Sequence, residues 1–363
     1  MTEPVLRRLQ LRDFRCFARL DWEPPSPRLL LAGPNGSGKT SVLEATYLAA
    51  TSKSFRAPRL EACLRRGAGS FEVVARVGER PTRELAVRWS PAERSRTLDD
   101  KPTPLAEHLA VLPTLAWSHA DQELLTGAPE LRRRFLDRAA VLLRPALLDD
   151  LTRYRRALAA KRALLEQGRP SPAELDSWNR LLARHGAALV AARGALAAGL
   201  DAALTALAVR HLPSLPPVAL AYRASTPAAG AGEEALYAAL EAARARELAR
   251  RAPLVGPHRD DLEISWNGGS ARAGASAGEC KALGLLLLAA TAERLTSSGR
   301  EPMLLVDDAD AELDRERLVA VVGAFAGVAR LVATSARPEV WGDGLGLETV
   351  AWTGSGPATS GAS

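Results

Sequence analysis

One octet, residues 33–40, constrains this 363-residue chain more than any other feature, and it reads Gly33-Pro34-Asn35-Gly36-Ser37-Gly38-Lys39-Thr40. It fits the pattern G-x-x-x-x-G-K-[ST], between a short apolar run at 29–32 and helical apolar spacing at 41–48. Glycines let the backbone N–H groups turn inward onto a phosphate, and the helix N-terminus adds partial positive charge. The octet therefore predicts a nucleoside triphosphate site, with Lys39 on the phosphates and the Thr40 hydroxyl on Mg²⁺.

Composition is that of a globular protein, with 47% hydrophobic and 25% charged residues and a net charge of +6. The positive charge is compatible with a polyanionic partner such as nucleic acid. Cys16, Cys63 and Cys280 lack metal-ligand spacing, which favours reduced thiols and a cytoplasmic location. We see no signal peptide, and the longest uncharged apolar stretch, 282–292, is too short to cross a bilayer. We therefore expect no membrane segment.

Periodicity divides the chain into α/β material at both ends and helices between them. Strand patterns occur within 5–31, at 71–77, 84–89 and 112–118, and again at 303–306 and 330–334. Residues 130–250 are dense in Ala, Leu and Arg with helical spacing. We predict four segments: 1–129 and 251–352 as the two parts of an α/β nucleotide-binding domain, 130–250 as an inserted all-helical subdomain, and 353–363 as a disordered tail.

The second half of the site is predicted 267 residues after Thr40, where the apolar run 303–306 ends in Asp307 and Asp308. A carboxylate at the end of a strand beside a phosphate loop can hold the Mg²⁺ shell, and we assign this role to Asp307. Asp308 would then face the γ-phosphate and orient or deprotonate water. The alternative is that both are solvated strand-end or helix-capping acids.

A second glycine-containing loop, Gly274 to Glu279, precedes the helix predicted after Ser276. Ser276 followed three residues later by Glu279 fits a capping box. A glycine loop at a helix start is also an anion site, and one subunit rarely needs two such sites for one γ-phosphate. If this loop faces the nucleotide of a partner subunit, dimerisation and nucleotide binding become linked.

The order of these motifs resembles the head domains of ABC and SMC-type ATPases. Two further segments, 127–137 (GAPELRRRFLD) and 255–262 (VGPHRDDL), are similar to the hallmark segments of the RecF family of bacterial recombination mediators. Residues 11–15 and 53–56 match that family too, and the resemblance covers almost the whole chain except the tail. It implies an ABC/SMC-like ATPase head, mixed sheets around a phosphate-loop α/β core, with an inserted all-helical subdomain.

The resemblance also implies roles for individual residues. Residues 33–40 would be the Walker A loop with Lys39 as its catalytic lysine, Asp307 the Walker B carboxylate and Asp308 the residue serving slow hydrolysis. Ser276, Gly278 and Glu279 would lie in the signature loop (Ser276–Glu279) that contacts the partner's γ-phosphate, and Asp314 would be the D-loop aspartate. Glu279-Cys280 departs from the glutamines usual in the family. A Pro-Glu pair is missing near 117–121, which leaves Asp121 or Gln122 as the Q-loop residue, and Thr334 or Ser335 stands where a switch histidine is otherwise found.

RecF-like proteins bind DNA at gaps and junctions as ATP-dependent homodimers, and they cooperate with RecR and RecO to load RecA. The resemblance therefore implies ATP, Mg²⁺, DNA, a second copy of this chain and these three proteins as cofactors and partners, with weak ATPase activity. Candidate DNA contacts are Lys53, Arg56, Arg59, Arg65, Arg66, Arg132 and Arg133. Solvated surface charge is the alternative for each, and Arg132 and Arg133 have a structural alternative as well.

His258, beside Asp260 and Asp261, is predicted to be structural or to serve a dimer contact, with direct chemistry as the alternative. Two other classes of protein compete with this interpretation of the whole chain. An ABC transporter subunit would not carry the long helical insert or the segment 255–262. An SMC protein would need two long heptad arms, and 130–250 is too short and too often broken by Pro and Gly.

Overall fold

The computed structural model describes residues 5–78, 81–168, 171–226, 232–270, 274–308, 310–341, 346–354 and 356–357. The chain folds into two compact units. Unit 1 comprises residues 1–122, 206–215 and 276–363, and unit 2 comprises 123–205 and 216–275. The division differs from the predicted segments, because 251–275 belongs with the helical part of the chain and 206–215 belongs with the α/β part.

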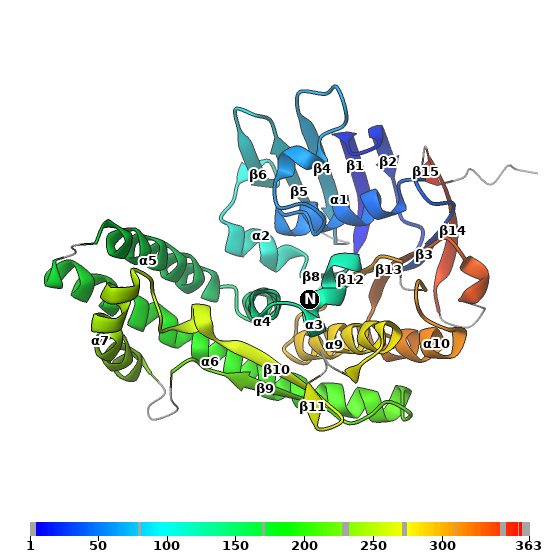
Figure 1. Cartoon of the computed structure of the whole chain (residues 1–363). Helices are drawn as coiled ribbons and strands as arrows, with labels where there is room; N and C mark the ends of the chain where they lie inside the picture. Colours follow the sequence, from blue (N-terminus) through cyan, green and yellow to red (C-terminus); the bar gives the residue numbers. More distant parts are fainter. Residues whose placement is uncertain are drawn as a thin grey trace, which may run out of the picture. The chain divides into compact units, whose positions relative to one another are not determined.

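The first sheet of unit 1 is antiparallel, in the order β2-β1-β4-β5-β6-β7. The strands are β1 (Leu6–Phe14), β2 (Phe17–Trp22), β4 (Phe71–Val77), β5 (Arg83–Trp89), β6 (Arg94–Leu98) and β7 (Lys101–Pro102). The alternation of apolar and polar residues explains why these segments form strands. In β1, for example, Leu9 and Leu11 are buried between more exposed polar neighbours. The inward side chains join one core with α1 (Lys39–Thr51), and Figure 1 shows this helix lying against the sheet.

The second sheet of unit 1 carries the nucleotide-binding motifs and has the order β15-β14-β3-β13-β12-β8. The strands are β3 (Arg28–Ala32), β8 (Thr114–Trp117), β12 (Met303–Val306), β13 (Arg330–Ser335), β14 (Glu348–Thr353) and β15 (Gly356–Pro357). The short helix α2 (Leu105–Val111) directly precedes β8. All pairs except β14–β15 are parallel, and β12 and β13 are buried throughout, which explains their largely apolar runs. The helices α9 (Ala277–Ser297) and α10 (Arg315–Ala324) pack side by side here (Figure 1).

Unit 2 contains helices and a small antiparallel sheet, so the inserted subdomain is not all-helical. Its helices are α3 (Glu123–Thr126), α4 (Pro129–Leu143), α5 (Leu147–Gln167), most of α6 (Pro172–His211) and α7 (Glu233–Arg250). The sheet has the order β11-β10-β9, with β9 (Val218–Arg223), β10 (Asp261–Trp266) and β11 (Gly269–Ser270). The strand β9 was hidden in the sequence because its alanines also suit a helix, although Val218 and Leu220 alternate inward.

The helix α6 is the one described helix that is long and apolar enough to cross a membrane, with a window of mean hydropathy 1.5. Its leucines are explained by packing, since Leu182, Leu189, Leu196 and Leu200 are buried in the protein. Arg193 on the same helix is also buried and pairs with Asp137. The apolar character of α6 therefore has a structural cause within the fold.

The predicted disordered tail begins instead in ordered structure. The strand β14 ends at Thr353 and pairs antiparallel with β15, and Trp352 is buried in the core of unit 1. The remaining tail residues, 355 and 358–363, lie outside the described residues. The small polar composition of this segment concealed the short hairpin.

Candidate nucleotide-binding site

The predicted phosphate loop lies between β3 and α1, and two of its glycines are required by their surroundings. Gly38 has φ +91°, and an added Cβ would lie 2.6 Å from the Phe17 ring. A Cβ on Gly33 would lie 2.2 Å from the carbonyl oxygen of Trp352. Any side chain at either position would therefore displace the loop. The strand–loop–helix context expected from the sequence is confirmed.

Two polar side chains of the loop are buried in positions suited to an anion. The Lys39 ammonium donates hydrogen bonds to the carbonyl oxygens of Gly33 (2.7 Å) and Pro34 (2.9 Å) and is 5% exposed. The Ser37 hydroxyl oxygen is buried and has no hydrogen-bond partner among the described residues. Buried polar groups are normally satisfied, so an unpaired hydroxyl beside a folded-back lysine fits a ligand that supplies acceptor oxygens. Pro34, Asn35 and Gly36 form the exposed tip of the loop.

Asp307 is brought to this loop by the strand order. The strand β13 separates β3 from β12, and Thr334 on β13 lies between the two motifs. The Asp307 carboxylate accepts hydrogen bonds from the hydroxyls of Thr40 (2.8 Å) and Thr334 (2.8 Å). Burial raises the pKa of Asp307, which these two hydrogen bonds partly oppose. The hydroxyl of Thr40 and the carboxylate of Asp307 are hard oxygen ligands of the kind that Mg²⁺ takes alongside phosphates.

Asp308 begins a turn that leads to α10. Its backbone N–H donates to the Thr334 hydroxyl (2.9 Å), and its φ of +46° lies in the left-handed region. Asp314 caps α10, because its carboxylate accepts from the N–H of Arg317 (2.8 Å). Thr334 therefore contacts both residues assigned to metal and water, which suits a residue at the switch position.

The two candidates for the Q-loop residue have different partners. The Asp121 carboxylate accepts from the backbone N–H (3.0 Å) and hydroxyl (2.9 Å) of Ser118, which closes a local turn. The Gln122 amide donates to the Glu312 carboxylate (3.2 Å), in the turn after β12. The Gln122 side chain thus contacts the turn after β12.

The signature loop contains the predicted capping box. The Ser276 hydroxyl accepts from the N–H of Glu279 (3.3 Å), and the Glu279 carboxylate accepts from the N–H of Ser276 (2.8 Å). The Ser276 N–H and the Ser276 hydroxyl (2.7 Å) both donate to the Glu279 carboxylate, and these two hydrogen bonds lower the pKa of Glu279. Gly278 packs closely against the turn after β12, since an added Cβ would lie 3.0 Å from the Glu312 carbonyl oxygen. The capping explanation of this loop is therefore correct, and it leaves Ser276 exposed at the helix start.

Candidate DNA contacts of unit 1 lie in the segment that follows α1. The side chains of Lys53, Arg56, Arg59 and Arg66 are exposed, and Arg65 is half-buried in an ion pair with Asp13 (2.7 Å). A residue that the sequence did not reveal organises this segment. Glu44, fully buried on α1, binds the Arg15 guanidinium (2.6 Å) and lies 3.5 Å from that of Arg56. A lone acid within an apolar helical run was its only signal.

Arg132 and Arg133 occupy a different setting, inside unit 2. The Arg132 guanidinium donates to both carboxylate oxygens of Asp261 (2.8 and 2.9 Å) and is 11% exposed. Arg133 donates to the carbonyl oxygen of Asp260 (2.7 Å). The two hallmark segments are thus each other's partners. The geometry supports the structural alternative for Arg132 and Arg133 over DNA contact.

The same cluster also contains Asp137, Asp260 and His258 of the hallmark segments. Arg193 on α6 pairs with Asp137 (2.8 Å), and Tyr222 donates a hydrogen bond to the Asp260 carboxylate. His258 Nδ1 lies 2.7 Å from the Tyr154 hydroxyl. Burial lowers the pKa of His258 to about 4, so the ring is neutral at physiological pH. This setting favours the structural role predicted for His258 over chemistry.

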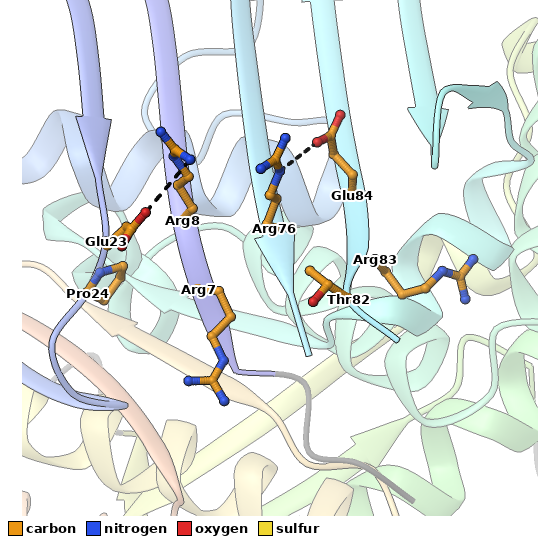
Figure 2. Close-up of a pocket in the computed structure, with 8 residues that line it drawn as sticks. All are labelled: Arg7, Arg8, Glu23, Pro24, Arg76, Thr82, Arg83 and Glu84. Carbon is orange, nitrogen blue, oxygen red and sulfur yellow. Dashed lines mark hydrogen bonds and ion pairs between the residues drawn. The ribbon is translucent and has the colours of Figure 1, made fainter. Parts of the chain in front are cut away.

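Figure 2 shows a further polar cavity, of about 560 Å³, on the antiparallel sheet of unit 1. Three of the arginines that line it face carboxylates: Arg8 pairs with Asp21 (2.6 Å), Arg76 with Glu84 (2.9 Å) and Arg83 with Asp99 (2.6 Å). The charge of these three arginines is therefore balanced within the sheet. Within the described ranges, no cluster of three or more His, Cys, Asp or Glu side chains could hold a metal ion by itself. A Mg²⁺ ion at Thr40 and Asp307 would accordingly share its coordination with phosphate oxygens.

Comparison with known proteins identifies one matching family profile and several relatives that share one name. A family profile described as an AAA domain matches residues 8–74. The chain is 38% identical over 350 residues to the DNA replication and repair protein RecF of Anaeromyxobacter sp. (strain Fw109-5), covering 91% of this chain and 92% of that protein. It is 36% identical over 352 residues to the protein of the same name from Frankia alni, covering 91% and 93%.

Solved structures support the fold. A structure described as the recombination mediator protein RecF with ATP, in the RecFOR pathway, superposes with a TM-score of 0.87 at 21% identity, covering 98% of both chains. The Smc head domain from Pyrococcus furiosus, bound to the C-terminal domain of ScpA, gives a TM-score of 0.56 at 14% identity, covering 98% of this chain and 95% of that one. The ATPase-head fold predicted from the sequence is confirmed.

Proposed function

The chain belongs to the RecF family of DNA replication and repair proteins, and we propose that it is a DNA-binding recombination mediator whose assembly is set by ATP. The observation that carries this proposal is that Asp307 is hydrogen-bonded to both Thr40 and Thr334, directly beside Lys39 of the phosphate loop in unit 1. These residues lie in three segments of the sequence and meet because β3, β13 and β12 are neighbours.

ATP would bind on the loop Gly33–Thr40. Lys39 would exchange its two carbonyl partners for phosphate oxygens, and the buried Ser37 hydroxyl would gain a partner. Thr40 and Asp307 would hold Mg²⁺, which neutralises charge that develops on the phosphates. Asp308, at the start of the following turn, would orient the attacking water. An aspartate is shorter than a glutamate, which suits slow, DNA-stimulated turnover.

The second half of the nucleotide site would come from another copy of the chain. Ser276 is exposed at the N-terminus of α9, where the helix dipole favours an anion. In an ATP-bound homodimer, the signature loop of each protomer would close on the γ-phosphate held by its partner, with Asp314 nearby. Loss of the γ-phosphate would remove this contact and release the dimer.

DNA would be held through phosphate contacts from Lys53, Arg56, Arg59, Arg65 and Arg66. The exposed side chains among them support this assignment, and such contacts are independent of sequence and sensitive to salt. We place the protein in the cytoplasm at gapped duplexes or at junctions of single- and double-stranded DNA. There it would cooperate with RecR and RecO in loading RecA during repair and replication restart.

Binding to a gapped duplex, followed by fluorescence anisotropy, tests the proposal. We expect tight binding with Mg²⁺ and ATP, and weak binding with ADP or for Lys39→Met. Lys101→Met, which removes an exposed lysine of β7, is the matched control and should bind as the unaltered chain does. ATP-dependent DNA binding that persists in Lys39→Met would contradict the proposal.

A further inference from the structure

Lys281 is a buried lysine one turn inside α9, and both of its resolved hydrogen bonds reach across to the turn after β12. The ammonium donates to the carbonyl oxygens of Asp308 (2.8 Å) and Ala311 (2.6 Å). The residue is only 2% exposed. Burial lowers the pKa of Lys281, while the nearby carboxylates of the turn act in the opposite direction. Burying a cation is costly, and this cost indicates that the two hydrogen bonds from Lys281 to the turn are important for the structure there.

The turn that Lys281 contacts is described at residues 308 and 310–312. Its backbone is unusual at two of these residues. Asp308 has φ +46° and Glu312 has φ +66°, both in the left-handed region that non-glycine residues rarely adopt. Such conformations persist only where the surroundings enforce them. The Asp310 carboxylate supplies one restraint, through the Ser335 hydroxyl (3.0 Å). The two hydrogen bonds from Lys281 supply another, at both sides of Asp310.

The signature loop packs against the same turn. Gly278 lies so close to Glu312 that a Cβ would come within 3.0 Å of its carbonyl oxygen. One turn beyond Lys281, a Cβ on Gly284 would lie 2.0 Å from the Trp117 ring, so α9 can sit at this depth on β8 only with glycine there. The start of α9 is thus fixed to β8 and to the turn at once.

We propose that Lys281 is a positioning residue that makes the turn carrying Asp308 and the signature loop move as one body. The turn belongs to the chain's own nucleotide site, and the signature loop belongs to the site completed by the partner. Lys281 therefore couples the two nucleotide sites of the dimer through a single side chain. The inference rests on the proposed function, because it requires an ATP-linked homodimer.

Lys281→Met removes the ammonium and keeps the apolar stem. We expect the monomer to bind a fluorescent ATP analogue with unchanged affinity, and ATP-dependent dimerisation to weaken about tenfold. Turnover should fall through kcat with KM retained, and Lys281→Arg, which keeps a cation there, should recover part of the loss. A matched fall in nucleotide affinity and dimerisation would show a general structural role and overturn the proposal.

Mixed dimers test the coupling directly. Pairing an intact chain with a Lys39→Ala chain leaves one working site, built from the intact chain's phosphate loop and the other chain's signature loop. We expect Lys281→Met to slow that site about tenfold when placed in either chain. An effect from only one placement, or from neither, would overturn the coupling.

The control is another buried lysine of the described structure, Lys161, which pairs with Glu247 (2.6 Å) in unit 2. Lys161→Met with Glu247→Leu removes this pair without leaving a buried charge, and should leave ATP-dependent dimerisation unchanged. If the unaltered chain does not dimerise with ATP, the proposed function itself fails. If it does, and Lys281→Met dimerises as well as the control, only the inference about Lys281 fails.

Discussion

The nucleotide-binding site of unit 1 and the arginine–carboxylate cluster of unit 2 use similar side chains for different ends. In the cluster, Arg132 and Arg193 each meet a carboxylate, and Asp260 accepts from Tyr222 and from the N–H of Ser225 (2.7 Å). In the nucleotide-binding site, the hydrogen bonds of the Lys39 cation go to carbonyl oxygens. Carbonyls can be exchanged for phosphate oxygens at little cost, whereas a buried ion pair cannot be opened cheaply.

This difference separates a ligand-binding site from a cluster that stabilises the fold. Ser37 keeps an unpartnered hydroxyl among the described residues and Asp307 an elevated pKa, both of which a ligand with Mg²⁺ would relieve. The hallmark segments of unit 2 instead tie α4, α6 and β10 to one another through Arg132, Arg133 and Arg193. We conclude that sequence motifs of equal prominence mark ligand binding in one unit and fold architecture in the other.

Removing Lys39 tests whether the nucleotide-binding site is built for a ligand. We expect Lys39→Ala to weaken ATP binding by about 3–6 kcal/mol, since two charge-assisted hydrogen bonds contribute roughly 1.5–3 kcal/mol each. Isothermal titration calorimetry measures this effect, and urea denaturation should show no loss of stability. A large loss of stability with intact ATP binding would make Lys39 a structural residue like those of unit 2.

Removing Arg193 tests whether the cluster of unit 2 stabilises the fold. Arg193→Leu leaves Asp137 without its buried partner, for an expected loss of about 3–5 kcal/mol in the free energy of unfolding. Urea denaturation measures the loss, and Arg193→Leu with Asp137→Leu should recover much of it. ATP affinity per folded molecule should stay as in the unaltered chain, and a changed affinity would contradict the division of roles.

His108 makes the stability of the fold depend on pH. His108 is fully buried in unit 1, and burial lowers its pKa from 6.5 to about 4. The unfolded chain therefore binds a proton below pH 6.5 that the folded chain refuses until about pH 4. Stability should be unaffected by this group above pH 6.5 and should fall by about 3 kcal/mol on acidification to pH 4.

The variant His108→Gln should reduce that acid-induced loss, because glutamine can donate to the Ala49 carbonyl oxygen without titrating. Urea denaturation at stepped pH values measures it. An equally steep loss in the variant would show that other groups cause the acid sensitivity.

The smallest predicted effects separate Arg56 from Arg132. Arg56→Glu should weaken DNA binding and lower the slope of log affinity against log salt by about 1. Arg132→Met should leave DNA binding unchanged and cost about 1–2 kcal/mol of stability, through its lost hydrogen bonds to Asp261. Anisotropy titrations at several salt concentrations would decide between them, and a DNA defect confined to Arg132→Met would reverse the assignment.

The parts of this molecule that could be predicted from sequence are those whose signal is local. The loop Gly33–Thr40 is read from eight consecutive residues, and Asp307 from the strand that ends before it. Lys281 and Glu44 were missed because their partners lie far along the chain or in a loop without a pattern. The strand β9 was missed because β10, which pairs with it, follows only after α7.

Sedimentation velocity measures whether ATP sets the assembly of this chain. The chain would be measured with Mg²⁺ and ATP, with ADP and without nucleotide, each with and without gapped DNA. We predict a dimer with ATP, stabilised further by gapped DNA, and a monomer in the other nucleotide conditions. A chain that stays monomeric with ATP and gapped DNA, or that dimerises equally with ADP, would contradict an assembly set by the γ-phosphate.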